Sequence, residues 1–411
     1  MENKTNSQIK YCNQYDAIEN YLKSNYNFRF NEVILSVEYS LKGTDNWIIL
    51  SEYEEHSIYI SLKKARYKIP YTEFDILINS TFSKKVNPVR DYIYSLPPWD
   101  TTTDYIQKLA DTVTTTKSDF WNKAFKKWFV AMIASALDDK IVNQSVIVFH
   151  GKQGAGKSTW FNTLLPNELK QYYHAKNINP KCKDALRLLS EKILINLEEL
   201  TIGKKTEAEV FKEMVTLPEI ETRIVFGKRH TKIPRLASLV ASVNESEFIN
   251  DPTGSRRLLV FDIKVIDYKH NIPIDKVISQ AKYLFEHGYK YYFDGNEIDE
   301  ILENNTEYCV STNEESLILK RYKPIAPHKA NIFMTATDIV EDLINKENSR
   351  CYKLNIMTIG KYLKLHGFAK VKKKGLYKWA LARIEDEVAV SKKLNITAET
   401  PEVEEIINTL F

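Results

Sequence analysis

The sequence predicts an α/β protein built around a mostly parallel sheet. From about residue 141 to residue 322, apolar runs that end in turns alternate with amphipathic helical patterns. Strands that alternate with helices are joined by crossovers, so they lie parallel and are covered on both faces. The strands predicted here are Ser145–Phe149, Lys192–Leu197, Leu236–Val243 and Arg257–Ile263.

Other predicted domains flank this sheet. Residues 1–85 mix short alternating runs with amphipathic stretches and predict a small N-terminal α+β domain of unknown role. Residues 86–140 predict a helical region that leads into the sheet. Residues 323–384 predict a helical pair followed by two short strands around Gly375, an order typical of a winged helix. The acidic tail, 385–411, is expected to be peripheral.

The composition favours a soluble cytoplasmic protein. The chain has 411 residues, of which 43% are hydrophobic and 27% charged, and it has neither an apolar leader nor a run long enough to span a membrane. Its four cysteines lie far apart, without the paired spacing of a zinc site or a disulfide framework. A net charge of +4 does not by itself indicate a nucleic-acid partner. The functional prediction therefore depends on motifs.

A glycine-rich turn joins the first predicted strand to a predicted helix in the stretch VIVFHGKQGAGKST, which begins at Val146. Its residues fit the pattern G-x-x-x-x-G-K-[ST]. In that pattern glycines let backbone amides point at phosphate oxygens, the lysine reaches the outer phosphates and the hydroxyl binds Mg²⁺. The sequence thus predicts a site for ATP and Mg²⁺. The residues expected to bind the nucleotide are Gly151, Gln153, Gly154, Ala155, Gly156, Lys157, Ser158 and Thr159.

Two glutamates directly follow the predicted strand that ends at Leu197. Hydrolysis of a nucleotide needs acidic groups that hold magnesium and activate water, and the end of a neighbouring strand is where they are expected. We assign Glu198, with Ser158, to the metal and Glu199 to the water as its base. The alternative is an acidic helix cap after a core strand, which the upstream phosphate loop disfavours.

The next predicted strand is followed by an amide and then by two arginines. Asn244 could position the attacking water or sense the outer phosphate, although it could also be an ordinary turn residue. An arginine that reaches a neighbouring subunit's nucleotide is worth about 10³ to 10⁵ in rate. Arg256 and Arg257 are candidates for this role, and the sequence does not separate them. The alternative is a pair that stabilises a surface loop.

Two basic segments are candidates for binding DNA. The stretch from Glu221 to Arg235 predicts a hairpin with a basic tip, which in a ring of subunits would line the pore and follow a phosphate backbone. The stretch KVKKKGLYK, residues 370–378, predicts a basic wing that could bind duplex DNA at an origin. The alternatives are a solvated turn and a protein-docking module. The residues expected to contact DNA are Lys228, Arg229, His230, Lys372, Lys373 and Lys374.

In combination, GKQGAGKST, the strand-end glutamates, the basic hairpin, SVNESEFINDPTGSRR and the upstream NPVRDYI resemble the virulence-associated protein E family of mobile-element P-loop ATPases. The resemblance covers roughly residues 85–290. Members look like superfamily 3 helicases of the AAA+ class and are related to poxvirus-type primase-helicases. The resemblance implies an AAA+ core and a homo-hexameric ring that hydrolyses ATP while moving on single-stranded DNA during replication of a phage or integrated element.

The chain departs from related motors at Asn196 and Leu197, where an acid often precedes the strand-end glutamate. The division of roles between Glu198 and Glu199 is therefore less certain. The chain also shows neither the Asp-x-Asp pattern of a primase centre nor the His-x-His pattern of a rolling-circle nuclease. A separate primase or replication initiator is a candidate partner.

Two other functional classes fit parts of the sequence. One is a nucleotide-switch ATPase in an antiviral or regulatory complex, in which DNA is never unwound. The other is a small-molecule P-loop kinase. The kinase is disfavoured because Asn244, Arg256 and Arg257 have no obvious counterpart in such an enzyme.

Overall fold

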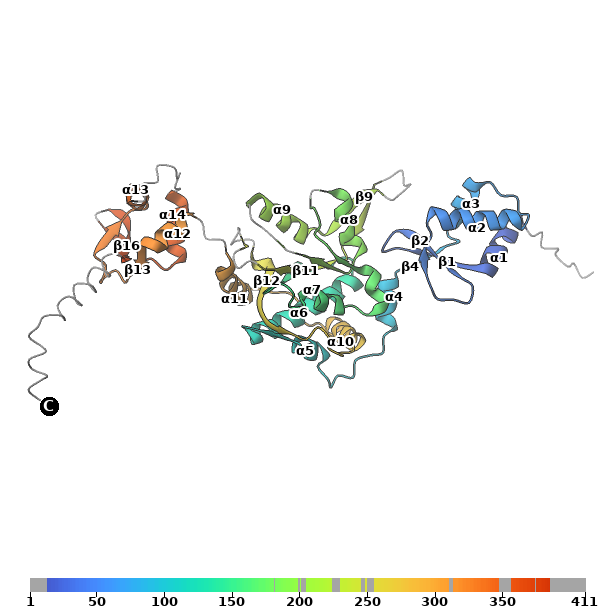
Figure 1. Ribbon diagram of the computed structural model, residues 1–411, viewed down its shortest axis with the longest axis horizontal. Coiled ribbons are helices and arrows are strands. Elements are labelled where there is room, and N and C mark those ends of the chain that lie inside the picture. Colours follow the sequence, from blue (N-terminus) through green and yellow to red (C-terminus); the bar gives the residue numbers. More distant parts are fainter. Residues whose placement is uncertain are drawn as a thin grey trace, which may run out of the picture. The chain divides into compact units, whose positions relative to one another are not determined.

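The computed structural model describes residues 13–180, 182–198, 200, 205–223, 230–244, 248–249, 255–309, 313–346, 356–373 and 375–384. The chain forms two compact units, Met1–Cys309 and Val310–Phe411 (Figure 1). Helices and strands are mixed in both units. The prediction of a mixed α/β protein is therefore confirmed. Within the described residues, no helix is both long and apolar enough to cross a membrane.

The N-terminal part of the first unit is a four-stranded sheet with three helices. Its strand order is β3-β2-β1-β4, with β1 antiparallel to β2 and parallel to β4. The helices bury a separate hydrophobic cluster that includes Ile18, Leu22 and Phe74. The elements are α1 (Gln14–Asn25), β1 (Tyr26–Asn31), β2 (Ser36–Leu41), β3 (Ile48–Ile49), α2 (Glu52–Lys64), α3 (Tyr71–Ile78) and β4 (Lys84–Val86).

A helical region follows and leads into the central sheet. Its longest helix, α6, buries Trp121 and Trp128 in the largest hydrophobic cluster of the unit. Every residue of α6 from Lys127 to Ala136 is buried, so the second half of this helix is enclosed on all sides. The elements are α4 (Pro88–Ser95), α5 (Tyr105–Ala110), β5 (Val113–Thr115) and α6 (Ser118–Leu137).

A six-stranded sheet forms the centre of the first unit, in the order β5-β12-β6-β11-β8-β7. The strands from β12 to β7 are parallel, and β5 is antiparallel to β12. Strands β8 and β11 are buried along their whole length, which explains their continuous apolar runs. The strands are β6 (Val146–His150), β7 (Tyr173–Ala175), β8 (Leu194–Leu197), β11 (Ser238–Val243) and β12 (Leu258–Ile266).

Helices cover both faces of this sheet. Figure 1 shows α8 and α9 over one face, and α6, α7 and α10 over the other. Alternate residues of β8 reach the two sides: Leu194 packs in the cluster with α6 and Ile195 in the cluster with α8. The covering elements are α7 (Lys157–Thr163), η1 (Asn167–Tyr172), α8 (Lys183–Glu191), α9 (Lys205–Thr216) and α10 (Ile274–Glu286).

Three smaller features complete the first unit. Strands β9 (Glu219–Arg223) and β10 (His230–Pro234) form an antiparallel pair between α9 and β11. A short turn, η2 (Ser255–Arg257), precedes β12. Helix α11 (Asn296–Asn305) and the turn η3 (Thr306–Tyr308) close the unit.

The second unit has its own sheet and core. Strand β16 pairs antiparallel with β13, β14 and β15. The sequence places the domain boundary between residues 322 and 323, but the compact unit starts earlier, because Ile318 and Tyr322 belong to its buried cluster. The elements are α12 (Asn313–Arg321), β13 (Tyr322–Pro324), β14 (Ile332–Met334), α13 (Ala336–Lys346), α14 (Ile356–Leu365), β15 (Lys370–Lys373) and β16 (Leu376–Arg383).

Candidate nucleotide-binding site

The glycine loop leaves the carboxyl end of β6, the strand that separates β12 from β11. Both neighbours of β6 come later in the chain, so the connections that follow β6 lead to strands on both of its sides. Open parallel sheets bind ligands at the carboxyl end of a strand in this position. Gly154 and Gly156 have φ angles of +80° and +85°, which glycine adopts without strain. A Cβ at Gly156 would also collide with the ring of Tyr268. The loop therefore requires glycine at this position for two reasons.

Lys157 lies at the centre of the site and is only 6% exposed. Its ammonium group donates hydrogen bonds to the carbonyl oxygens of Gly151 and Lys152 and to Asn244 Oδ1, the last two at 3.0 and 2.9 Å. Burial lowers the pKa of Lys157. Among the residues that the structure describes, no carboxylate forms an ion pair with this ammonium group. A buried cation held only by neutral acceptors favours an anion nearby.

A pocket of about 650 Å³ opens beside the loop. Residues 153–159 form one wall of it, so every residue expected to bind the nucleotide except Gly151 lines the pocket. Glu198 and Asn244 contribute from the ends of β8 and β11. Because carboxyl ends of parallel strands meet at one edge of a sheet, residues far apart in the sequence share this pocket. Glu199 lies outside the described residues.

Asn196, where the chain departs from related motors, is fully buried on β8 and does not line the pocket. It lies two positions before Glu198, which directly follows the strand. Burial, together with the charge of Glu198, raises the pKa of the neighbouring Tyr173 to about 12. Asn196 is therefore a buried residue of β8 behind the site, whereas Glu198, directly after β8, is the acid that lines the pocket among the described residues.

Sequence reasoning missed four residues that line this pocket: Lys176, Asn177, Ser242 and Tyr268. Lys176 and Asn177 follow β7, a strand of three residues that gave no periodic signal. Ser242 lies inside the apolar run of β11. Tyr268 follows the end of β12, and the rule that identified Glu198 and Asn244, applied to the last strand, would have identified it.

The two arginines lie at the opposite edge of the sheet. They belong to η2, which precedes β12, whereas the glycine loop follows β6, and these two strands are parallel. Arg256 is exposed, Arg257 is half-buried, and both line a second pocket of about 420 Å³ with Tyr291, Tyr292 and Phe293. The structure does not bring the arginines to the glycine loop of the same chain.

Asn305 at the end of α11 holds the arginine turn. Its buried amide nitrogen donates hydrogen bonds to the carbonyl oxygens of Ser255 and Leu258, each at 2.8 Å. These two carbonyls bracket Arg256 and Arg257. The preceding residue, Asn304, donates to Val260 O at 2.9 Å. Helix α11 therefore fixes the backbone from which the arginines project.

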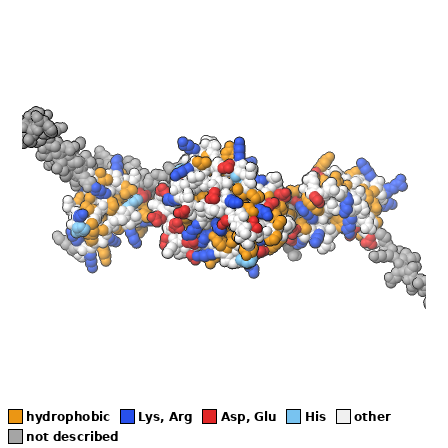
Figure 2. Space-filling model, turned by 90° about the horizontal axis from the view of Figure 1, so that it is seen from below, with side chains coloured by type: hydrophobic (Ala, Val, Ile, Leu, Met, Phe, Trp, Pro, Cys, Tyr) orange, Lys and Arg blue, Asp and Glu red, His pale blue; other side chains and the backbone are white. Residues whose placement is uncertain are grey.

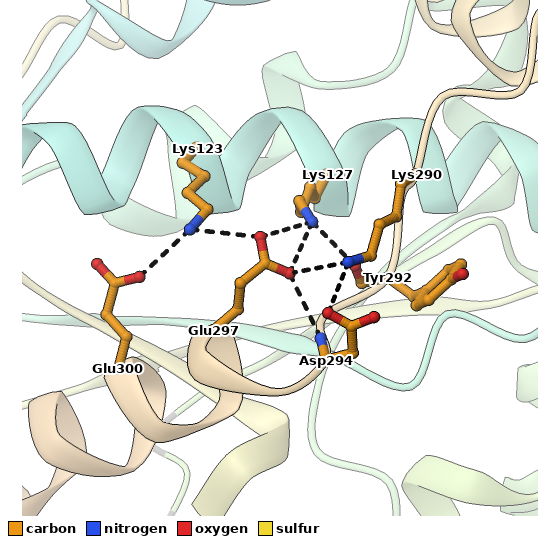
Figure 3. Close-up of polar contacts among 7 residues, drawn as sticks. All are labelled: Lys123, Lys127, Lys290, Tyr292, Asp294, Glu297 and Glu300. Atoms are coloured by element: carbon orange, nitrogen blue, oxygen red, sulfur yellow. Dashed lines mark hydrogen bonds and ion pairs between the residues drawn. The ribbon is translucent and has the colours of Figure 1, made fainter.

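An ion cluster holds the other end of α11 against α6 (Figure 3). Lys127 contacts Glu297 at 2.8 Å and donates to the carbonyl oxygen of Tyr292 at 3.0 Å. Lys123 bridges Glu297 and Glu300 at 3.3 and 3.4 Å. Burial pushes the pKa of Glu297 up, but hydrogen bonds from Lys127 and other donors outweigh it and bring the pKa down to about 2. The cluster therefore holds in place the segment Tyr291, Tyr292 and Phe293, which lines the same pocket as the two arginines.

The predicted DNA contacts are only partly within the described residues. Lys228, Arg229 and Lys374 lie outside them, and His230 begins β10. At the base of the hairpin, Lys232 is paired with Glu219. Arg235 is fully buried, donates to the carbonyl oxygens of Met214, Val215 and Ala237, and has its pKa lowered to about 10 by burial. Arg235 thus anchors the hairpin to the end of α9.

The predicted wing forms strands β15 and β16 and the turn at Gly375. Lys372 and Lys373 are exposed on β15. Lys373 Nζ lies 3.2 Å from the ring centre of Phe333, and Lys370 Nζ lies 5.0 Å from that of Tyr377. Figure 2 shows basic and acidic side chains interspersed over the central part of the face drawn, in keeping with the small net charge.

Fold and site together define an α/β protein with a glycine loop and a polar pocket at the carboxyl edge of a parallel sheet. The model of the virulence-associated protein E-like domain matches residues 93–317, more than half of the chain, and the chain belongs to this family. No curated protein matched the chain.

Among solved structures, the chain is similar to the apo C-terminal region of NrS-1, residues 305–718. The identity is 13%, the match covers 90% of this chain and 98% of that one, and the TM-score is 0.46. An A-form apo structure of the same region gives 12% identity, 88% coverage of both chains and a TM-score of 0.42.

Proposed function

We propose that the protein is an ATP-dependent DNA helicase or translocase of a phage or other mobile genetic element. It would act in the cytoplasm as a hexameric ring around single-stranded DNA during replication. The observation that carries the proposal is the setting of Lys157, a buried ammonium group beside Glu198 and Asn244, with no carboxylate partner among the described residues.

The donor set fits a magnesium-bound ATP on a P-loop AAA+ core. Loop amides between Gly151 and Ser158 and the ammonium group of Lys157 would hold the phosphates. Ser158 and Glu198, which line the same pocket, supply the oxygen ligands that Mg²⁺ prefers. Bound magnesium would supply positive charge that stabilises the phosphoryl oxygens. Asn244 would hold Lys157 and orient water, and Glu199 would accept the proton of that water.

A ring explains why the arginines lie at the other edge of the sheet. In a head-to-tail assembly, the edge that carries Arg256 and Arg257 faces the glycine loop of the next copy. Asn305 and the Glu297 cluster would hold that edge rigid, because an arginine that completes a neighbour's site must be accurately positioned.

Two elements would contact DNA. The tip of the β9–β10 hairpin, with Lys228, Arg229 and His230, would follow the single strand, and Arg235 would couple this hairpin to α9. The second unit would be a winged-helix-like domain whose Lys372, Lys373 and Lys374 approach duplex origin DNA. Primer synthesis or origin nicking would come from a separate primase or initiator.

The experiment is the ATP hydrolysis rate of the purified chain with and without a short single strand. We expect DNA to stimulate the rate, and DNA binding to weaken steeply as salt rises. Changing Lys228 and Arg229 together to Ala should spare the basal rate and lower the stimulation. ATP hydrolysis that ignores DNA would instead support a nucleotide switch in an antiviral or regulatory complex, and absence of hydrolysis would refute both.

A further inference from the structure

The pocket at the glycine loop has a polar side and an aromatic side. Glu198 and Asn244 follow β8 and β11, which lie on one side of β6 in the sheet. Tyr268 follows β12, which lies on the other side. A ligand whose phosphates lie at Lys157 and face the polar side therefore has its remaining part directed toward Tyr268.

Residues on both sides of Tyr268 are held by hydrogen bonds. Before it, the amide of Asp267 donates to Thr112 O at 2.8 Å. After it, His270 Nε2 shares a hydrogen bond of 2.9 Å with the hydroxyl of Thr163 at the end of α7. The ring itself lies so close to Gly156 that a Cβ there would collide with it. Tyr268 is thus held against the glycine loop before any ligand binds.

The residue Tyr268 is nevertheless 38% exposed, although it lines a pocket. Its ring lies beside Gly156, and Lys269 Nζ lies 5.9 Å from the ring centre. A partly exposed aromatic side chain beside a phosphate-binding loop is suited to stack on a flat heterocycle. Resting on the proposed function, we propose that Tyr268 is the platform on which the purine base of the bound nucleoside triphosphate stacks. Stacking depends on the π face and not on hydrogen bonds, so the phenol oxygen contributes little.

Calorimetric binding of ATP and of inorganic tripolyphosphate to the full chain tests this inference. We expect Tyr268→Ala to weaken ATP binding roughly tenfold, the size of a lost base–aromatic stack, and to leave tripolyphosphate binding unchanged. Tyr268→Phe should bind both like the wild type. Tyr268→Leu keeps the bulk without the π face and should behave like Tyr268→Ala. Tyr53→Ala, which removes a 78% exposed tyrosine from α2, is the matched control.

The outcomes separate the two proposals. Wild-type affinity for ATP in Tyr268→Ala would overturn the stacking proposal while leaving the proposed function intact. An equal loss of ATP and tripolyphosphate would also overturn it, because the ring would then only shape the loop. A wild-type chain that binds neither ligand would refute the proposed function, and the base site with it.

Discussion

Lys157 donates a hydrogen bond of 2.9 Å to the side-chain oxygen of Asn244, which joins the helix after β6 to the end of β11. The amide can accept this bond without neutralising the ammonium charge, as a carboxylate would. The lysine is therefore oriented and still able to attract an anion. This pair links the phosphate loop to the strand end where water would be positioned.

Changing Asn244 tests what this amide does. We expect Asn244→Ala to lower ATP hydrolysis about 100-fold while ATP still binds, because the phosphate loop stays intact. Asn244→Asp should weaken ATP binding, since a carboxylate at this place would pair with Lys157 and repel phosphate. Calorimetry and steady-state hydrolysis measure the two effects. Unchanged binding in Asn244→Asp would contradict the role given to the pair.

We expect substitutions of Glu198 and Glu199 to have different effects. Glu199→Gln should bind ATP and hydrolyse it about 10² to 10⁴ times more slowly, because the water loses its base. Glu198→Gln should also reduce the dependence of ATP binding on Mg²⁺, since Glu198 lies in the pocket with Ser158. A magnesium titration of ATP binding distinguishes them. If Glu199→Gln removes the magnesium dependence instead, the two roles are reversed.

The stability of the turn η2, which carries Arg256 and Arg257, should depend on Asn305. Asn305→Ala leaves two buried carbonyl oxygens without their donor and should lower the free energy of unfolding by about 2 kcal/mol. Glu303→Ala, on an exposed position of the same helix, is the control.

In mixtures with wild type, Arg256→Ala or Arg257→Ala subunits should reduce hydrolysis more than in proportion to their fraction. A strictly proportional loss would mean that neither arginine acts across an interface.

Acid should weaken the cluster around Glu297. The folded chain holds the pKa of this carboxyl at about 2, below its ordinary 4.5. Its contribution is therefore fully present above about pH 4.5 and is lost as the pH falls toward about 2. Urea unfolding at several pH values should show the advantage of wild type over Glu297→Gln shrinking by on the order of 3 kcal/mol across this window. A stability difference between wild type and Glu297→Gln that does not change with pH would contradict the pairing of Glu297 with Lys123 and Lys127.

The sequence predicted the central sheet well, because buried parallel strands are long apolar runs that end in chemically distinctive residues. β6, β8, β11 and β12 all occur within a few residues of their predicted bounds. β5 and β7 were missed because three-residue strands show no periodicity. Glu198 and Asn244 line one pocket because parallel strands bring their carboxyl ends to one edge of the sheet.

Features that depend on tertiary packing were not predictable in this way. Arg235 belongs to a basic segment that suggests a DNA contact, yet the fold buries it against carbonyl oxygens of α9. Asn305 belongs to an ordinary polar helix, and its role becomes visible only when η2 lies beside α11. Tyr268 follows the end of β12, where the strand-end rule points to the site, but its close approach to Gly156 is a feature of the tertiary fold. Each of these depends on which distant backbone lies within reach, which local patterns do not specify.

The reaction proposed at the glycine loop is tested most directly by the ATP hydrolysis rate of Lys157→Ala beside that of the wild-type chain. We expect measurable hydrolysis by the wild type and a loss of at least about 100-fold in the variant, with the unfolding midpoint preserved. A variant that hydrolyses ATP at the wild-type rate would contradict it, because the pocket beside the glycine loop would then not be where the reaction occurs.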